Sequence, residues 1–179
     1  DLDQQSLLEK ELNRDYHILT ADSRLDQIAR DFVEHYSLRW ESGKAMFICI
    51  DKLTTVKMYN LVQKYWKEKI NELITGIDSL PDPQEIAPAM RKIDWMKETM
   101  MAVVVSEEQN EINKFKKYEL EIEPHRKFMK DGFTTEDGNT LQLDDAFKKD
   151  EHPFRVAFVC AMWLTGFDVK SLATLYLDK

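Results

Sequence analysis

Apolar residues recur at helical spacing in two long segments of the chain. Between 22 and 40 they are separated by three or four positions, which places them on one face of a helix. Asp22 or Ser23 suits the start of this helix, because either side chain can accept hydrogen bonds from its free amides. The same spacing between Met58 and Leu73 predicts a second, longer helix. The apolar positions of the first helix are Leu25, Ile28, Ala29, Phe32, Val33 and Tyr36.

Four short apolar runs predict strands. Each is nearly continuous in apolar residues and is bounded by turn-forming or charged residues, as in strands that are buried on both faces. The runs span 44–51, 101–106, 154–162 and 171–178. Shorter helices are expected around 89–100, 108–117, 123–130 and 143–149, and loops over 76–88 and 131–140.

The alternation of strands and helices predicts an α/β fold with a mostly parallel sheet and helices on both faces. We expect one domain, with residues 1–20 as a lead-in segment and 21–179 as its core. Ligands of such sheets bind beyond the carboxyl ends of the strands. The loops 51–55, 106–109 and 164–170 are therefore the first places to look for function.

The charge balance limits the partners that the chain can bind. It carries 33 acidic against 25 basic residues, a net charge of −8, which argues against an extensive DNA-covering surface and leaves room for a narrow contact. No apolar run approaches the roughly 20 residues that cross a membrane. The start of the chain lacks a signal-peptide pattern and an initiator methionine, so we expect a cytoplasmic piece of a longer protein. Cys49 and Cys160 lie within apolar runs and are expected to be reduced thiols.

The candidate loops carry residues that suit phosphate binding. Hydroxyl groups and free helix-terminal amides point at anions, and a glycine lets the backbone approach closely. Asp168 could accept a hydrogen bond from a ribose hydroxyl. A purely structural interpretation stays open, in which Thr54 caps a helix and Gly166 forms a turn. The full set is Asp51, Lys52, Thr54, Thr55, Ser106, Thr165, Gly166 and Asp168.

Other chemistries lack their sequence patterns. The chain has neither a Gly-rich phosphate loop nor a dinucleotide-binding fingerprint. Ser106 is not in a nucleophile elbow. The histidines are scattered without metal-binding spacing, so no metal site is expected. The residues alone supply no complete catalytic site.

Three segments resemble the restriction, or motor, subunit of type I restriction enzymes, which is a superfamily 2 helicase-like translocase. The most specific is "MWLTGFDVKSLATLYLDK", residues 162–179, which resembles motif V and its following strand. Residues 25–62 resemble the family's motif IV strand with its flanking helices, and 100–111 resemble its second strand. Together the resemblance covers roughly residues 20–179.

The resemblance implies a three-layer RecA-like fold, the second of two RecA-like domains in the full subunit. That subunit also carries a nuclease domain and works with modification and specificity subunits in bacteria. It is expected to use ATP and Mg²⁺ to pull double-stranded DNA through the complex before cleavage.

The resemblance also implies roles for individual residues. Gly166 and Asp168 are expected to face the nucleotide cleft. Contact with DNA is expected from Thr165, Gly166, Lys52, Thr54, Thr55 and Ser106.

The family's phosphate-binding lysine, magnesium-binding acid and nuclease acids are expected before residue 1, and its arginine finger is expected after Lys179. The chain by itself is therefore expected to be catalytically inactive and to bind no cofactor. Two alternatives stay open: another superfamily 2 helicase or type III restriction subunit, and a non-catalytic α/β protein-binding module.

Overall fold

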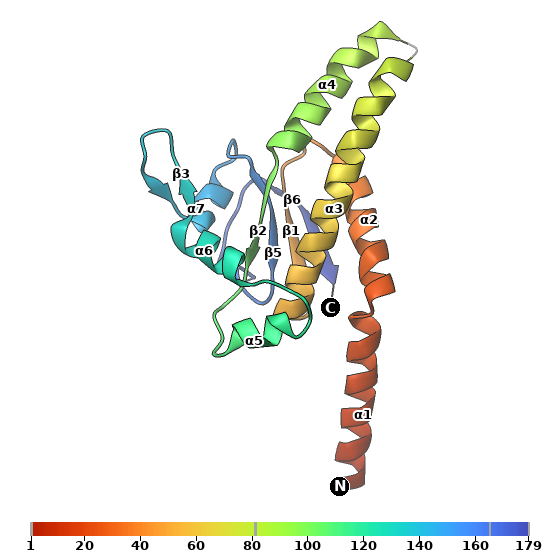
Figure 1. Ribbon diagram of the computed structural model, residues 1–179, viewed down its shortest axis with the longest axis vertical. Coiled ribbons are helices and arrows are strands. Elements are labelled where there is room, and N and C mark those ends of the chain that lie inside the picture. Colours follow the sequence, from red (N-terminus) through yellow and green to blue (C-terminus); the bar gives the residue numbers. More distant parts are fainter. Residues whose placement is uncertain (1, 81, 165, 179) are drawn as a thin grey trace.

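The computed structural model describes residues 2–80, 82–164 and 166–178 of the 179-residue chain. Its centre is a four-stranded sheet in the order β2-β5-β1-β6, and every neighbouring pair is parallel (Figure 1). All four expected strands are confirmed. Their bounds are Lys44–Cys49 for β1, Met100–Val104 for β2, Phe154–Val159 for β5 and Leu172–Asp178 for β6.

Three helices cover one face of the sheet. They are α2 (Asp22–Leu38), α3 (Lys52–Gly76) and α4 (Pro83–Glu98), and the last two form a hairpin that extends past the sheet (Figure 1). The apolar face of α2 that the sequence predicts is buried there, with Phe32 wholly inaccessible. Phe32 packs edge-on against Phe47 of β1 and Phe158 of β5, and the last two rings stack 5.6 Å apart.

The opposite face is covered by smaller elements. Here α7 (Leu143–Lys148) and the β3–β4 hairpin bury a second apolar cluster against the sheet, while α6 (Glu123–Asp131) packs against β2. The hairpin strands are Phe133–Thr134 and Thr140–Leu141, and α5 spans Glu111–Lys116. The resulting helix–sheet–helix layering is that of a RecA-like α/β fold, as expected.

A buried lysine joins this second layer to the sheet. Lys44 of β1 is 1% exposed, and its ammonium donates a hydrogen bond of 3.0 Å to the carbonyl of Ala146 in the last turn of α7. Burial lowers the pKa of Lys44 to about 8. The helix dipole places partial negative charge at that carbonyl, which compensates in part for the loss of water around the ammonium.

The structure corrects three details of the expected elements. Residues 76–88 are not one loop, because a 3-10 turn spans Ile77–Ser79 and α4 begins at Pro83, where Asp82 caps the amide of Gln84 at 2.8 Å. A proline at the first helical position needs no amide partner, so this proline starts a helix.

Helix α1 (Leu2–Leu19) runs into α2 and was not expected as a helix. The residue before α2 is Ala21, which has an extended backbone and offers no side-chain cap, so neither Asp22 nor Ser23 is the cap. The apolar residues of α1 are mostly exposed, with Leu8 at 56% and Leu12 at 59%, which explains why the core pattern is weak there. Within the described residues, no helix is both long and apolar enough to cross a membrane.

The paired rings at the centre of the sheet provide a test of this core. Replacing Phe158, which is 0% exposed, by alanine leaves a cavity beneath Phe47 and should lower the free energy of unfolding by about 3–5 kcal/mol. Met90→Ala, midway along α4, where the side chain is 53% accessible, should change it by less than about 0.5 kcal/mol. Urea unfolding followed by circular dichroism measures both, and equal losses would contradict the assigned core.

Candidate functional site at the carboxyl edge of the sheet

The parallel strands bring three loops to one edge of the sheet. Residues 50–51 and the start of α3 follow β1, 105–110 follow β2, and 160–171 connect β5 to β6, with no helix among the residues of this connection that the structure describes. Because β5 lies between β2 and β1, its connection emerges between the other two loops. This edge collects the expected site residues that the structure describes.

Asp51 organises the loop after β1. Its carboxylate caps α3 by accepting a hydrogen bond from the amide of Thr54 at 2.6 Å, and it also accepts one from the hydroxyl of Tyr16 on α1. The bond to Asp51 raises the pKa of Tyr16 to about 12, because loss of the proton would place two negative charges side by side. Asp51 therefore fastens α1 to the first candidate loop.

Thr54 and Thr55 have structural roles in this loop. They are 2% and 0% exposed, and the hydroxyl of Thr55 donates to the backbone carbonyl of Asp51 at 2.7 Å. A direct contact with DNA, which was expected of both, needs an exposed side chain. The structure therefore corrects this expectation: both threonines lie in the core beneath the loop, where α3 packs on the sheet.

An ion-pair bridge joins the first two loops. The ammonium of Lys52 lies 3.3 Å from the carboxylate of Glu108, which also lies 3.2 Å from Lys114. The hydrogen bond from Lys114, followed by that from Lys52, lowers the pKa of Glu108. Glu108 is exposed, so the bridge orients Lys52 more than it stabilises the fold.

Arg126 holds the end of β2 in place. From α6 it forms two hydrogen bonds with the carboxylate of Glu111, at 2.5 and 2.6 Å, and its guanidinium also donates to the backbone carbonyls of Val105 and Ser106. These bonds lower the pKa of Glu111. The Ser106 side chain stays exposed at the edge, while its backbone is fixed.

The connection 160–171 has a packed side and an exposed side. Trp163 and Phe167 stack 4.3 Å apart, and both lie against Phe147 of α7. Gly166 is exposed with φ +69°, a conformation that glycine adopts most readily, and a Cβ there would meet nothing within 4 Å. Asp168 is also exposed. Thr165 lies outside the described residues.

A second ion pair joins α2 to the end of β6. Arg24 lies 2.6 Å from the carboxylate of Asp178, whose side chain is 4% exposed, and it also donates to the carbonyl of Leu19 at 2.8 Å. Asp178 is the register partner of Cys49 at the end of β1. Cys49 is buried and forms no disulfide, and burial raises the pKa of its thiol.

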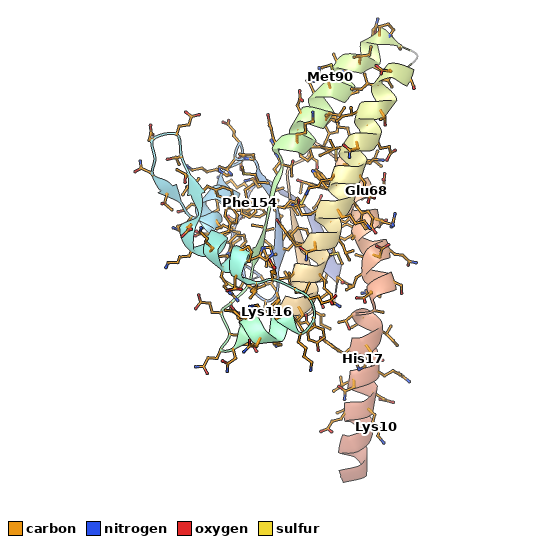
Figure 2. The ribbon with its side chains drawn as sticks, viewed as in Figure 1. Lys10, His17, Glu68, Met90, Lys116 and Phe154 are labelled. Carbon is orange, nitrogen blue, oxygen red and sulfur yellow. The ribbon has the colours of Figure 1, made fainter. Side chains whose placement is uncertain are left out.

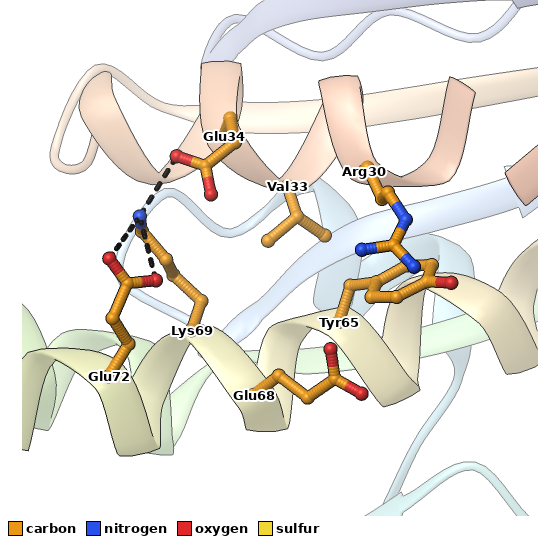
Figure 3. A pocket seen from close by; sticks show the side chains of 7 residues that line it. All are labelled: Arg30, Val33, Glu34, Tyr65, Glu68, Lys69 and Glu72. Atoms are coloured by element: carbon orange, nitrogen blue, oxygen red, sulfur yellow. Dashed lines mark hydrogen bonds and ion pairs between the residues drawn. The ribbon is translucent and has the colours of Figure 1, made fainter. Parts of the chain in front are cut away.

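A groove between α2 and α3 is a poorer candidate site. Its volume is about 270 Å³, and Figure 3 shows the Lys69 side chain turned toward Glu34 and Glu72, while Glu68 points away from them. Lys69 pairs with Glu34 at 2.9 Å and with Glu72 at 3.2 Å, while the guanidinium of Arg30 lies over the ring of Tyr65. These contacts join two helices and leave little charge for a ligand.

Sequence reasoning missed the residues that brace the edge. Tyr16, Arg24, Glu111, Arg126 and Asp178 are far apart in the chain and follow no motif. The folded structure was needed to pair them.

The comparison with known families identifies the chain. The family model described as type I restriction enzyme subunit R domain 3 matches residues 41–179, which include β1, β2, β5, β6 and all three loops. The chain belongs to this family. The match agrees with the resemblance found in the motif V and motif IV segments and favours type I over the type III alternative.

Individual relatives show the same similarity. The MjaIXP and MjaVIIP proteins of Methanocaldococcus jannaschii, both putative type I restriction enzyme endonuclease subunits, are each 26% identical over 90% and 96% of this chain. The HindI endonuclease subunit of Haemophilus influenzae, also of type I, is 25% identical over 90% of it. The chain spans only 12% to 14% of the length of these relatives. No solved structure matches it significantly.

The Arg126–Glu111 pair provides a pH-dependent test of the braced edge. Arg126→Gln leaves Glu111, whose side chain is 10% exposed, without its cation, and should cost about 2–4 kcal/mol of stability at pH 7. The pKa of Glu111 is lowered in the folded state. The ion pair therefore stabilises the fold fully when the pH is well above about 4.3, the ordinary pKa of a glutamate. It is lost as the pH falls through the lower, folded-state pKa.

Urea unfolding of the wild type and the variant should therefore show a large difference at pH 7 and a smaller one at pH 3. Lys116→Gln is the control, because its ammonium lies 3.9 Å from Glu123 in a pair that is more than half exposed. It should change stability by less than about 0.5 kcal/mol. A difference for Arg126→Gln that stays constant with pH would contradict the role of the ion pair.

Proposed function

We propose that this chain is the second RecA-like domain in the restriction subunit of a type I restriction enzyme. Its carboxyl edge would form one side of an ATP cleft and part of the surface along which double-stranded DNA is moved. One observation carries the proposal: the family match includes the connection 160–171. In that connection Gly166 and Asp168 are exposed, and the neighbouring rings of Trp163 and Phe167 stack on each other.

Each exposed residue at the edge has a distinct task in the proposal. Gly166, with its open left-handed backbone, lets a phosphate approach the main chain closely. Asp168 accepts hydrogen bonds on the nucleotide side. Half-buried Lys52 is paired with Glu108 and would supply positive charge to a phosphate only by exchanging that partner, and exposed Ser106 supplies a hydroxyl. Thr165 keeps the DNA-contacting role that the resemblance implies.

The residues of this chain can hold only part of a nucleotide. Among those described, no cluster of three His, Cys, Asp or Glu side chains is placed to hold a metal ion. Asp168 suits a ribose hydroxyl, but the sequence contains no Gly-rich phosphate cradle. ATP and Mg²⁺ would therefore be held mainly by the first RecA-like domain of the longer protein, and DNA cleavage would belong to its nuclease domain.

The remaining partners follow from the same proposal. The complete subunit would act in the bacterial cytoplasm together with modification and specificity subunits, and the latter would read the DNA sequence. Phosphoryl transfer in such motors needs a phosphate cradle, a metal ion and a transition-state cation at the same time. This division of labour explains how a domain without a complete catalytic site can be required for catalysis.

Substitutions at the connection test the proposed cleft in the intact subunit. Asp168→Asn and Gly166→Val should each reduce DNA-stimulated ATP hydrolysis and translocation at least tenfold, corresponding to about 1.4 kcal/mol of lost transition-state stabilisation. Both positions are exposed and a Cβ at Gly166 would meet no atom within 4 Å, so neither change disturbs the core, although valine strains the local backbone at φ +69°. Lys170→Gln, at an exposed position of the same connection, is the matched control.

Phosphate release and triplex displacement measure the two activities, and thermal unfolding checks the fold. Full activity in both folded variants would refute the proposed cleft. It would indicate that Gly166 and Asp168 have only a structural role in the connection 160–171. Unfolding of Asp168→Asn would also count against the proposed cleft, because an exposed carboxylate at a ligand site should not be needed for folding.

A second prediction concerns the isolated chain. Incubated with ATP, Mg²⁺ and duplex DNA, residues 1–179 should release no phosphate above background and should leave the DNA uncut, because the other half of the cleft is missing. Sustained, DNA-stimulated phosphate release that co-purifies with the chain would show that it holds a complete site and would overturn the proposal.

A further inference from the structure

Lys44 of β1 contacts both the connection 160–171 and the helix against which that connection packs. Its ammonium donates a hydrogen bond of 3.0 Å to the carbonyl of Ala146 in α7 and lies 5.3 Å from the centre of the Phe147 ring. Its backbone amide donates a hydrogen bond of 2.7 Å to the carbonyl of Ser171, the last residue of the connection. A single residue of the sheet therefore holds the end of the connection and the helix next to its middle.

Helix α7 depends on contacts with the rest of the molecule. It has six residues, which is too short for a helix to be stable by itself in water. The carbonyl of Ala146 accepts hydrogen bonds from the amide of Lys149, at 3.3 Å, and from the ammonium of Lys44. Of these two bonds, the one from Lys44 joins the last turn of α7 to the sheet. Lys44 therefore fixes where α7 ends relative to β1.

Phe147 links α7 to the connection through contacts between rings. It is 0% exposed, and its ring lies 5.0 Å from that of Phe154 at the start of β5, which Figure 2 labels among the packed side chains of the body of the molecule. The Phe147 ring also lies 5.5 Å from Trp163 and 6.3 Å from Phe167, and these two rings of the connection stack on each other. A shift of α7 would therefore move the connection with it.

Asp168 lies between two anchored residues of the connection. Phe167 belongs to the ring stack, and Val169 is 9% exposed in the same apolar cluster as Phe147. The carbonyl of Val169 also accepts a hydrogen bond from the amide of Leu172 at 3.1 Å. Because the backbone is held on both sides, the direction of the exposed Asp168 side chain depends on the layer that α7 forms.

The backbone of the connection needs such support. Ala161 has a φ of +60° and Trp163 a φ of +63°, in the left-handed region that is unfavourable for residues with a Cβ atom. Conformations of this kind persist where surrounding contacts hold them in place. The contact of Trp163 with Phe147 is one of these, so we expect the connection to relax when α7 is released.

Stability does not explain a charge at position 44. Burial lowers the pKa of Lys44 to about 8, so folding disfavours the ammonium, although the ammonium is still the main form at neutral pH. An apolar side chain of similar length would avoid this cost. What lysine adds is a donor that reaches the carbonyl of Ala146.

We propose that Lys44 is a positioning residue of the nucleotide cleft: its ammonium holds α7, and α7, through Phe147, holds the connection so that Asp168 faces the ligand. Lys44 is buried and acts through these other residues. The inference rests on the proposed function, because it explains how Asp168 is placed and takes its contact with the nucleotide from that proposal.

The test compares two variants of the intact restriction subunit. Lys44→Met removes the donor and keeps an unbranched apolar side chain, so kcat/KM for ATP in DNA-stimulated hydrolysis should fall about fivefold. The midpoint of thermal unfolding should not fall, because a buried charge is removed. Val62→Ala, at a 0% exposed position in the apolar cluster on the opposite face of the sheet, is the control. It should lower the unfolding midpoint and leave kcat/KM within about twofold of the wild type.

A double-mutant cycle shows whether Lys44 acts through Asp168. Lys44→Met/Asp168→Asn should have a kcat/KM within about twofold of that of Asp168→Asn alone, because the second change removes the group that the first one displaces. Losses that multiply in the double variant would show that Lys44 acts by a different route and would overturn the inference.

Hydrogen–deuterium exchange measures the connection without reference to activity. In Lys44→Met the amides of residues 143–149 and 160–171 should exchange at least about threefold faster, while those of 100–117 stay unchanged. Val62→Ala should show no selective change in the connection. Unchanged exchange at 160–171 in Lys44→Met would overturn the inference, whatever the rate of ATP hydrolysis.

Failure of the proposed function has a different signature. In that case the folded Asp168→Asn variant hydrolyses ATP as fast as the wild type, which removes the role of Asp168 and with it the role proposed for Lys44. Faster exchange in Lys44→Met would then show that the contact between Lys44 and the connection is correct and that the assignment of the cleft is wrong.

Discussion

The burial of β1 and β5 on both faces is the constraint on which the rest of the structure depends. Phe47 and Phe158 point into one apolar cluster, and Ile48 and Val159 point into the other. A strand without a solvent-facing side must be covered by helices above and below, and crossovers of that kind produce parallel strands. In a parallel sheet, the loops that follow the strands lie at the same edge. The position of the candidate site is therefore set by core side chains that do not contact it.

Rigidity at this edge comes from polar contacts over the apolar core. Asp51 binds the start of α3 and the hydroxyl of Tyr16, while Arg126 fixes the end of β2 through two carbonyls and Glu111. Phe167 and Trp163 anchor the third loop by stacking. In the proposed function, one half of the cleft keeps its shape while the other moves, and these contacts would supply that stiffness from within one domain.

The division between buried and exposed residues also refines the expected site. Thr54 and Thr55 looked like phosphate contacts because hydroxyls follow a strand, but α3 starts two residues earlier and turns both inward. Gly166 and Asp168 occupy an equivalent place after β5 and stay exposed, because no helix follows that strand directly. The proposed function therefore rests more on the connection after β5 than on the helix start after β1.

Local pattern was sufficient for the elements of the core. A short run of apolar residues predicts a strand that is buried on both faces, and an apolar residue at every third or fourth position predicts one face of a helix. These two patterns were sufficient to predict β1, β2, β5, β6 and α2. The motif V segment likewise indicated the family from the sequence alone.

Ion pairs such as Arg24 with Asp178 and Arg126 with Glu111 join residues that are 154 and 15 positions apart. They produce no periodic pattern in the sequence, because exposed and buried charged residues look alike there. Tertiary structure alone decided those pairings, the inward turn of Thr54 and Thr55, and the direction of α1, because each depends on which surfaces the folded sheet brings together.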